Sequence, residues 1–183
     1  MNLYTADLHF GHANVIRFDH RPFQDADEMD DVLIKLWNDR VHDDDDVWII
    51  GDLIYRSDKD ATWYLKKLNG KKHLIIGNHE KAVMKNENAK KYFESIDMMR
   101  SITDNGPNGN VQVTMCHYPL AEWEGFYRGA YHVYGHIHSN KNEAYQFMSK
   151  FDNALNAGCM INRYAPASLR ELIENNRVFK NSD

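Results

Sequence analysis

Histidine, aspartate and asparagine side chains recur at five places in the sequence, each directly after an apolar run. Imidazole and carboxylate together are ligands that suit first-row metals such as Mn, Fe, Zn and Ni better than Ca or Mg. Of the ten histidines in the 183 residues, half fall in these places. The five segments are Asp7-Leu8-His9, Gly51-Asp52, Gly77-Asn78-His79-Glu80, His117 and Gly135-His136-Ile137-His138.

Seven of these side chains are candidate metal ligands, and their number indicates two ions. One tetrahedral zinc takes four ligands, whereas seven suit two ions that share a bridging carboxylate. Two divalent ions outweigh the charges of two aspartates, so the site is expected to remain positive and to favour an anionic phosphate ester. A hydroxide bridging the ions would attack phosphorus in line. The candidates are Asp7, His9, Asp52, Asn78, His117, His136 and His138.

The first three segments follow runs typical of buried parallel strands. Strands are predicted over residues 2–6, 47–50 and 73–76, which are mostly apolar, and residues 27–40 show the spacing of an amphipathic helix. A second helix is predicted from a capping box at Ser57 and Asp60 through Leu68, ended by Gly70. Right-handed crossovers place the carboxyl ends of such strands on one rim, where ligands bind.

The second half of the chain has a different pattern. A polar helix is predicted over residues 81–93, and strands over 96–103 and 111–116 are joined by a turn rich in glycine and asparagine. Further strands are predicted over 131–134 and 154–157. A last helix begins with a capping box at Ser168 and Glu171.

The composition is that of a soluble globular protein, with 43% hydrophobic and 27% charged residues. The net charge of -5 argues against a nucleic-acid scaffold. The sequence shows neither a leader pattern nor an apolar run long enough for a membrane span, so we expect a cytoplasmic protein. We expect Cys116 and Cys159 to be reduced and buried. The aspartate run 43–46 is interpreted as a solvated loop, because the glycine and glutamate of a calcium loop are missing.

The order of the five segments resembles the calcineurin-like metallophosphoesterase superfamily. That family runs Asp-x-His, Gly-Asp, Gly-Asn-His-Asp/Glu, a lone His and Gly-His-x-His, and the chain has all five between Leu3 and about Gly158. The resemblance implies an α/β (α+β) fold, a four-layer αββα sandwich of two mixed β-sheets flanked by helices. We expect residues 1–183 to form one such domain without a cap domain.

The resemblance also implies a role for each matching residue. One divalent ion is expected on Asp7, His9 and His138, and the other on Asn78, His117 and His136, with Asp52 bridging them. His79 matches the histidine that assists the leaving group or holds a phosphoryl oxygen. The metals are expected to be Mn, Fe, Zn or Ni, and the sequence does not choose among them.

The chain departs from the family where many members have Gly-Asp-x-x-Asp, because Tyr55 takes the second aspartate position. A carboxylate relay to His79 from this segment is therefore in doubt. Arg56 is a candidate substrate ligand, although a surface arginine is the favoured interpretation. His12, three residues after His9, is a second candidate substrate contact, with a hydrogen-bonded loop histidine as the alternative.

Two further groups of residues lie outside the five segments. Aromatic residues between residues 118 and 131 are candidates for a wall against a base or sugar, with packing as the alternative for half of them: Tyr118, Trp123, Phe126 and Tyr127. The histidines outside the five segments are interpreted as structural or surface residues: His20, His42, His73 and His132.

These observations favour a metal-dependent phosphoesterase, and within that class a phosphodiesterase on a nucleotide-type substrate. A phosphomonoesterase acting on a nucleotide or phosphoprotein is the first alternative. A nuclease is less favoured because the chain has a net negative charge. The alternative that is not an enzyme is a non-catalytic metal-binding scaffold. The sequence leaves the physiological substrate and the oligomeric state open.

Overall fold

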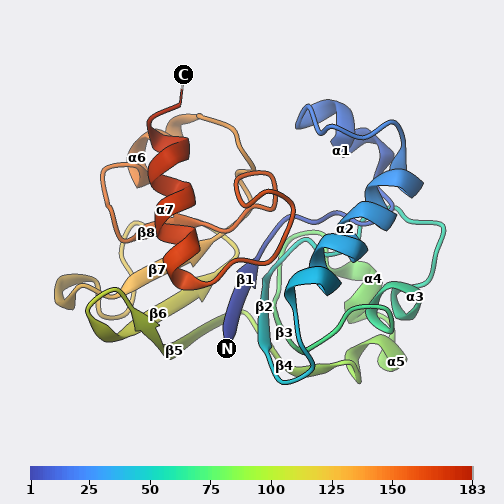
Figure 1. The fold of residues 1–183 in the computed structure, drawn as a ribbon, viewed down its shortest axis with the longest axis horizontal. Helices are drawn as coiled ribbons and strands as arrows, with labels where there is room; N and C mark the ends of the chain where they lie inside the picture. The colour runs from blue at the N-terminus through green and yellow to red at the C-terminus, as the bar shows by residue number, and fades with distance from the viewer. Residues whose placement is uncertain (183) are drawn as a thin grey trace.

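Two four-stranded β-sheets form the centre of residues 1–182, the part of the chain that our computed structural model describes (Figure 1). The first sheet is entirely parallel and has the order β1 (Asn2–Thr5), β2 (Asp46–Ile50), β3 (Lys71–Ile75) and β4 (Phe93–Asp97). The second contains β5 (Met99–Gly106), β6 (Gly109–Cys116), β7 (Tyr131–Tyr134) and β8 (Ala154–Asn156). Only its β5–β6 pair is antiparallel. The predicted α/β class with two sheets flanked by helices is confirmed, but only the second sheet is mixed, whereas both were expected to be.

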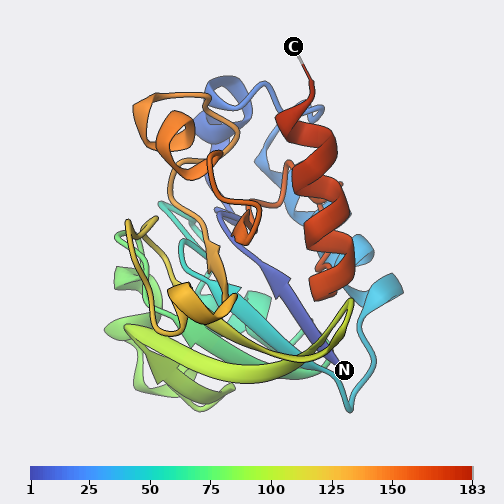
Figure 2. The same cartoon turned by 90° about the vertical axis from the view of Figure 1, so that its left-hand side faces the viewer.

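Helices flank both sheets. Figure 1 shows α2 (Ala26–Arg40), α3 (Ala61–Leu65), α4 (Lys81–Met84) and α5 (Glu87–Lys90) on the side of the first sheet. Beside the second sheet are α6 (Glu143–Met148) and α7 (Leu169–Lys180). The view in Figure 2 shows α7 running alongside β1. The remaining helical segments are α1 (Ala13–Phe18) and the 3₁₀ turn η1 (Phe126–Arg128).

The alternation of side chains along β2 explains why the first sheet is covered on both faces. Val47 and Ile49 belong to the apolar cluster that includes α2 and α3. Trp48 and Ile50 point the other way, into the cluster shared with Val113 of the second sheet. Residues two apart on a strand share a face, and burying each side chain of this size stabilises the fold by about 1.5–3 kcal/mol.

Three predicted elements differ from the structure. The helix expected over 81–93 is two short helices, because the Asn86 side chain accepts hydrogen bonds from the backbone of Asn88 and Ala89 and starts α5. The strand expected over 96–103 is divided after Asp97, where the chain passes from the first sheet to the second. The helix expected from Ser57 begins only after Asp60, which caps α3. Helices α1 and α6 were not predicted.

Two local predictions are confirmed. The glycine-rich turn joins β5 to β6, with Gly106 paired to Gly109. The capping box of α7 is formed, since the side chains of Ser168 and Glu171 each accept a hydrogen bond from the other's backbone. Within residues 1–182 we find no helix that combines the length and the apolar character needed to cross a bilayer.

Candidate metal centre

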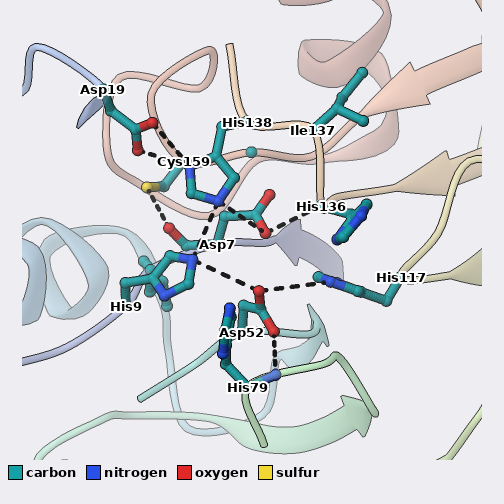
Figure 3. A network of polar contacts seen from close by, with 12 residues as sticks. Asp7, His9, Asp19, Asp52, His79, His117, His136, Ile137, His138 and Cys159 are labelled. Atoms are coloured by element: carbon teal, nitrogen blue, oxygen red, sulfur yellow. Dashed lines mark hydrogen bonds and ion pairs between the residues drawn. The ribbon is translucent and has the colours of Figure 1, made fainter. Parts of the chain in front are cut away.

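The loops that follow β1, β2, β3, β6 and β7 converge at one end of the two sheets. Figure 3 shows the side chains of Asp7, His9, Asp52, His117, His136 and His138 pointing toward a common space. These residues are far apart in the sequence, since Asp7 and His138 are separated by 131 positions. The strand order β1-β2-β3 of the first sheet and the parallel β6-β7 pair of the second account for this meeting.

Four of these residues form one tight group. The Nε2 atoms of His9 and His138 lie 3.1 Å apart, and His138 Nε2 lies 3.9 Å from Asp7 Oδ1. Together with Asp52, they offer ligand atoms that all lie within 4.8 Å of one another. Asp7, His9 and Asp52 are buried, and Asp7 Oδ2 has no hydrogen-bond partner within residues 1–182. This buried Asp/His cluster can bind a metal ion.

A second group lies on the other side of Asp52. Asn78 Oδ1 is 3.0 Å from His117 Nε2 and 2.9 Å from His136 Nδ1. The Nδ1–H of His117 donates to the carbonyl of Ile50 at 2.9 Å, which leaves Nε2 of the neutral ring with a lone pair. An amide oxygen and an imidazole lone pair facing each other repel unless a proton or cation lies between them. The donor set therefore fits a cation.

Asp52 stands between the two groups. Its Oδ2 atom is 3.6 Å from His9 Nε2 and 3.6 Å from His117 Nε2. Its other oxygen, Oδ1, accepts a hydrogen bond of 2.9 Å from the backbone N–H of His79. One carboxylate oxygen is thus equally close to a histidine of each group, which is the arrangement expected of a bridging ligand.

The backbone that positions these side chains is strained. Positive φ angles occur at Asp7 (56°), His9 (53°), Asp52 (56°), His136 (70°) and His138 (53°). Non-glycine residues rarely adopt this left-handed conformation, and each instance costs of order 1–3 kcal/mol. Such residues cluster at functional sites, where the surrounding structure holds them in place.

Two glycines allow the ligand side chains to approach the backbone. A Cβ atom at Gly77 would lie 2.4 Å from Asp52 Oδ1, and one at Gly135 would lie 2.9 Å from Asp7 Oδ2. Both distances are shorter than real Cβ contacts, so a side chain at either position would displace a candidate ligand. The glycines that precede Asn78 and His136 in the sequence are therefore part of the site geometry.

A buried ion pair behind the site was not predicted from the sequence. Both carboxylate oxygens of Asp19 lie 2.8 Å from Nδ1 of His138 (Figure 3). Arg21 donates to Asp19 Oδ2 at 2.9 Å and to the carbonyls of Asp7 and Leu8 at 2.8 Å each. A carboxylate on the far nitrogen of a histidine fixes its tautomer and aims the near nitrogen at a metal. Asp19 and Arg21 are only two residues apart, but no local signal links them to the site, because His138 is 119 positions away in sequence.

Glu80 is a second residue whose function the sequence did not reveal. Its buried carboxylate accepts hydrogen bonds from the backbone N–H groups of Asp52 (2.7 Å), Leu53 (2.9 Å) and Gly77 (2.9 Å). It therefore ties the loop after β2 to the loop after β3. The acidic residue at the end of Gly77-Asn78-His79-Glu80 therefore holds together the two loops that carry Asp52 and Asn78.

Burial dominates the electrostatics of the first group. It raises the pKa of Asp7 to about 6, against the smaller opposing effect of His138. Burial also lowers the pKa of His9, and the neighbouring His138 lowers it further. Burial alone would lower the pKa of His138. The hydrogen bond from its ring to Asp19 and the negative charges of Asp19 and Asp7 outweigh burial and raise that pKa. A cation bound here would stabilise the ionised carboxylate of Asp7 and displace its proton.

The predicted catalytic and substrate residues lie along one edge of the site. The ring of His79 is 5.6 Å from that of His9 and 4.0 Å from that of Tyr55. The ring of His12 is 5.6 Å from that of His9 and 4.7 Å from that of Tyr55. Tyr55 thus packs against both histidines. The exposed guanidinium of Arg56 lies 5.1 Å from the centre of the Tyr55 ring.

The aromatic wall is only partly formed. Tyr118 lies beside the site, with its ring 4.7 Å from His136. Trp123 and Phe126 instead pack in an apolar cluster with Tyr134 and α6, and Tyr127 is 84% exposed. Three of the four aromatic residues therefore do not line the site, because the loop folds back on the second sheet.

The other expected structural residues lie outside the site. His132 is buried, with Nδ1 donating to the carbonyl of Thr114 and Nε2 accepting from Leu120 N–H. His73 stacks on Trp48 at 4.1 Å. Both cysteines are free within the described residues, but only Cys159 is buried; Cys116 is half-buried, contrary to expectation.

Relatives of the chain occur in an archaeon and in phages. It is 33% identical to the uncharacterized protein MJ1445 of Methanocaldococcus jannaschii over 180 residues, which cover 96% of this chain and 92% of that protein. It is 30% identical to the Gene 66 protein of Mycobacterium phage D29 over 159 residues (74% and 77% of the two chains). The Gene 66 protein of phage L5 is also 30% identical, over 161 residues. No protein-family model matches the chain.

One solved structure shares the fold over nearly the whole chain. The protein of unknown function AQ665 from Aquifex aeolicus superposes with a TM-score of 0.68 and 22% identity, over 95% of this chain and 98% of that one. The nuclease MPE of Pseudomonas putida superposes with a TM-score of 0.49 and 19% identity, over 75% and 60% of the chains. The likeness to AQ665 shows a common fold.

Proposed function

The chain belongs to one family with MJ1445 and the Gene 66 proteins of the two mycobacteriophages, and we propose that it is a metal-dependent phosphoesterase. Within that class we propose a phosphodiesterase of the calcineurin-like metallophosphoesterase superfamily. The observation that carries the proposal is the position of Asp52, whose Oδ2 atom is 3.6 Å from one histidine of each ligand group. A structural ion-pair network has no need for a carboxylate shared in this way.

The geometry supports two ions that share Asp52. One divalent ion would be held by Asp7, His9 and His138. The other would be held by Asn78, His117 and His136, and Asp52 would bind both ions. Ions bound there would supply an acidified water and would withdraw negative charge from the phosphoryl oxygens. Four of the seven ligands, Asp7, His9, Asp52 and His117, are buried, which strengthens these electrostatic effects on their side of the site.

His79 is positioned to handle the leaving group. Its backbone N–H is bonded to Asp52 Oδ1 at 2.9 Å, so the residue is fixed relative to the shared carboxylate. Its ring packs on Tyr55 at 4.0 Å and reaches the edge of the site. Protonated His79 would give its proton from the imidazole to the departing alkoxide oxygen as the P–O bond breaks.

A diester is favoured over a monoester because a monoester dianion is usually held by extra arginines. Arg21 is close to the site, but its guanidinium is directed at Asp19 and at the carbonyls of Asp7 and Leu8. Arg56 is exposed at the edge, over Tyr55. Neither observation points to a second anchor for a doubly charged phosphate.

The test compares a nitrophenyl phosphodiester with the matching monoester, using protein loaded in turn with Mn, Fe, Zn and Ni. We expect a higher kcat/KM on the diester. Asp52→Asn should lose metal occupancy and activity on both esters, whereas Asp31→Asn, on the exposed face of α2, should keep both. Protein that retains two ions per chain and cleaves neither ester would overturn the proposal. Two ions per chain in Asp52→Asn would refute the bridging assignment.

A further inference from the structure

A groove opens beside His79, between the loop after β2 and the short helices α4 and α5. Its volume is about 850 Å³, and its lining includes Tyr55, Arg56, Lys59, His79, Lys81 and Lys85. His79 belongs both to this groove and to the edge of the candidate metal centre. The groove is therefore continuous with the site on the side that we assign to the leaving group. We call it the basic groove.

Cations predominate in the basic groove although the whole chain has a net charge of -5. Arg56, Lys81 and Lys85 are exposed, and none of them forms an ion pair within residues 1–182. Lys59 is paired with Asp27. The cations thus outnumber the acidic groups that could neutralise them.

The acidic residues of the groove are engaged elsewhere. Asp60 accepts hydrogen bonds from Thr62 and Asn86. Glu87 pairs with Lys90, outside the groove. Neither carboxylate is bonded to Arg56, Lys81 or Lys85 in the part of the chain that the structure describes.

The spacing of the two lysines is unfavourable without an anion. Lys81 begins α4 and Lys85 follows it by four positions, as the residue that caps the helix. Residues four apart lie on the same face of a helix, and like charges there repel. Glu80, the neighbouring carboxylate, is buried and bonded to the backbone of Asp52, Leu53 and Gly77, so it does not offset that repulsion.

We propose that the basic groove binds a second phosphate of the substrate, on the leaving-group side of the scissile diester. The inference rests on the proposed function, because a leaving group that departs past His79 enters this groove. Phosphate oxygens are the anions that lysine and arginine clusters bind. The exposed guanidinium of Arg56, which lies over the Tyr55 ring, adds a planar face on which a base can stack. The substrate class is thus a nucleotide diester that carries a further phosphate, as in short single-stranded nucleic acid or a dinucleotide with a terminal phosphate.

The experiment compares thymidylyl-thymidine with the same dinucleotide phosphorylated at either end. We expect the parent protein to prefer one of the phosphorylated forms about tenfold in kcat/KM at about 50 mM salt, where exposed charges are weakly screened. In Lys81→Glu/Lys85→Glu that preference should fall to about twofold or less. In the control Lys66→Glu/Lys150→Glu, which reverses two exposed lysines outside the groove, it should remain.

The outcomes separate the inference from the proposed function. Parent protein that cleaves all three dinucleotides with equal kcat/KM has no second phosphate site, although it is a phosphodiesterase. A preference that survives the double charge reversal, in protein with normal metal content and circular dichroism, also overturns the inference. Metal-loaded protein that cleaves no diester at all refutes the proposed function instead. With an octathymidylate, a further rise in preference identifies nucleic acid as the source of the phosphate, and an unchanged preference identifies a small nucleotide.

Discussion

Replacement of Asp19 by asparagine tests whether the residues behind the site tune the metal centre. The side chain of Asp19 is only 3% exposed, and it contacts both His138 and Arg21. Asparagine has the same shape and can still accept the hydrogen bond from Nδ1 of His138. It cannot supply the negative charge that now faces the imidazole and the guanidinium.

The expected effect on metal affinity follows from the contact with His138. The two oxygens of Asp19 each lie 2.8 Å from Nδ1, so the carboxylate makes the ring a better ligand and fixes its orientation. Loss of such an outer contact typically weakens metal binding by about 10–100-fold, or about 1.4–2.7 kcal/mol. The pKa of His138, which Asp19 helps to raise, should also fall.

The expected effect on stability follows from Arg21. The side chain of Arg21 is fully buried. In Asp19→Asn it would still donate to the carbonyls of Asp7 and Leu8, but it would lose its only counter-ion within residues 1–182. Breaking a buried ion pair by removing one partner costs about 3 kcal/mol or more. The variant should therefore unfold at a lower urea concentration in the presence of a chelator.

Competition with a fluorescent chelator gives the metal affinity, and urea unfolding gives the stability. Asp31→Asn removes the same charge from the exposed side of α2 and should change neither quantity measurably. A metal affinity of Asp19→Asn within twofold of the parent value, with stability reduced, would refute the reasoning. Asp19 would then support the fold without tuning the centre.

Two further predictions follow from individual histidines. His79→Ala should keep its metals and lose most turnover on esters with poor leaving groups, because it removes the proton donor; equal turnover of parent and variant on such an ester would exclude this role. Burial lowers the pKa of His132 from 6.5 to about 4, so the unfolded chain binds more protons between these values and stability falls as the pH falls from about 6.5 to about 4. The variant His132→Asn should therefore lose about 3 kcal/mol less stability than the parent over this pH range. Urea unfolding at pH 4–7 measures this, and parallel curves of stability against pH for parent and variant would contradict the prediction.

The strands could be predicted because their signals are local. The apolar runs before Asp7, Asp52 and Asn78 define β1, β2 and β3, and the parallel order of these strands follows from the helices between them. The meeting of the seven candidate ligands was expected from the same pattern. Their division into two groups around Asp52 required the resemblance as well as the pattern.

The supporting contacts could not be predicted because they join residues remote in sequence. Asp19 and His138 are 119 positions apart, and the aspartate sits in an unpredicted turn after α1. The carboxylate of Glu80 bonds to backbone groups, which any residue could offer, so no partner side chain marks it in the sequence. The place of Tyr55 against His79 depends on ring packing that an alternation of polar and apolar residues does not encode.

The strain in the loops explains why buried polar groups support them from behind. Five candidate ligands have left-handed backbone angles, which together cost on the order of 5 kcal/mol or more. Arg21 holds the carbonyls of Asp7 and Leu8, Glu80 holds the N–H of Asp52, and the side chain of Asn156 donates to the carbonyl of His138 at 2.7 Å.

Each strained loop is therefore fixed by a buried group that is not itself a candidate ligand. The ligand geometry is built by the protein's own hydrogen bonds. A site that binds a cation needs supporting contacts of this kind, which hold its ligands in a defined geometry.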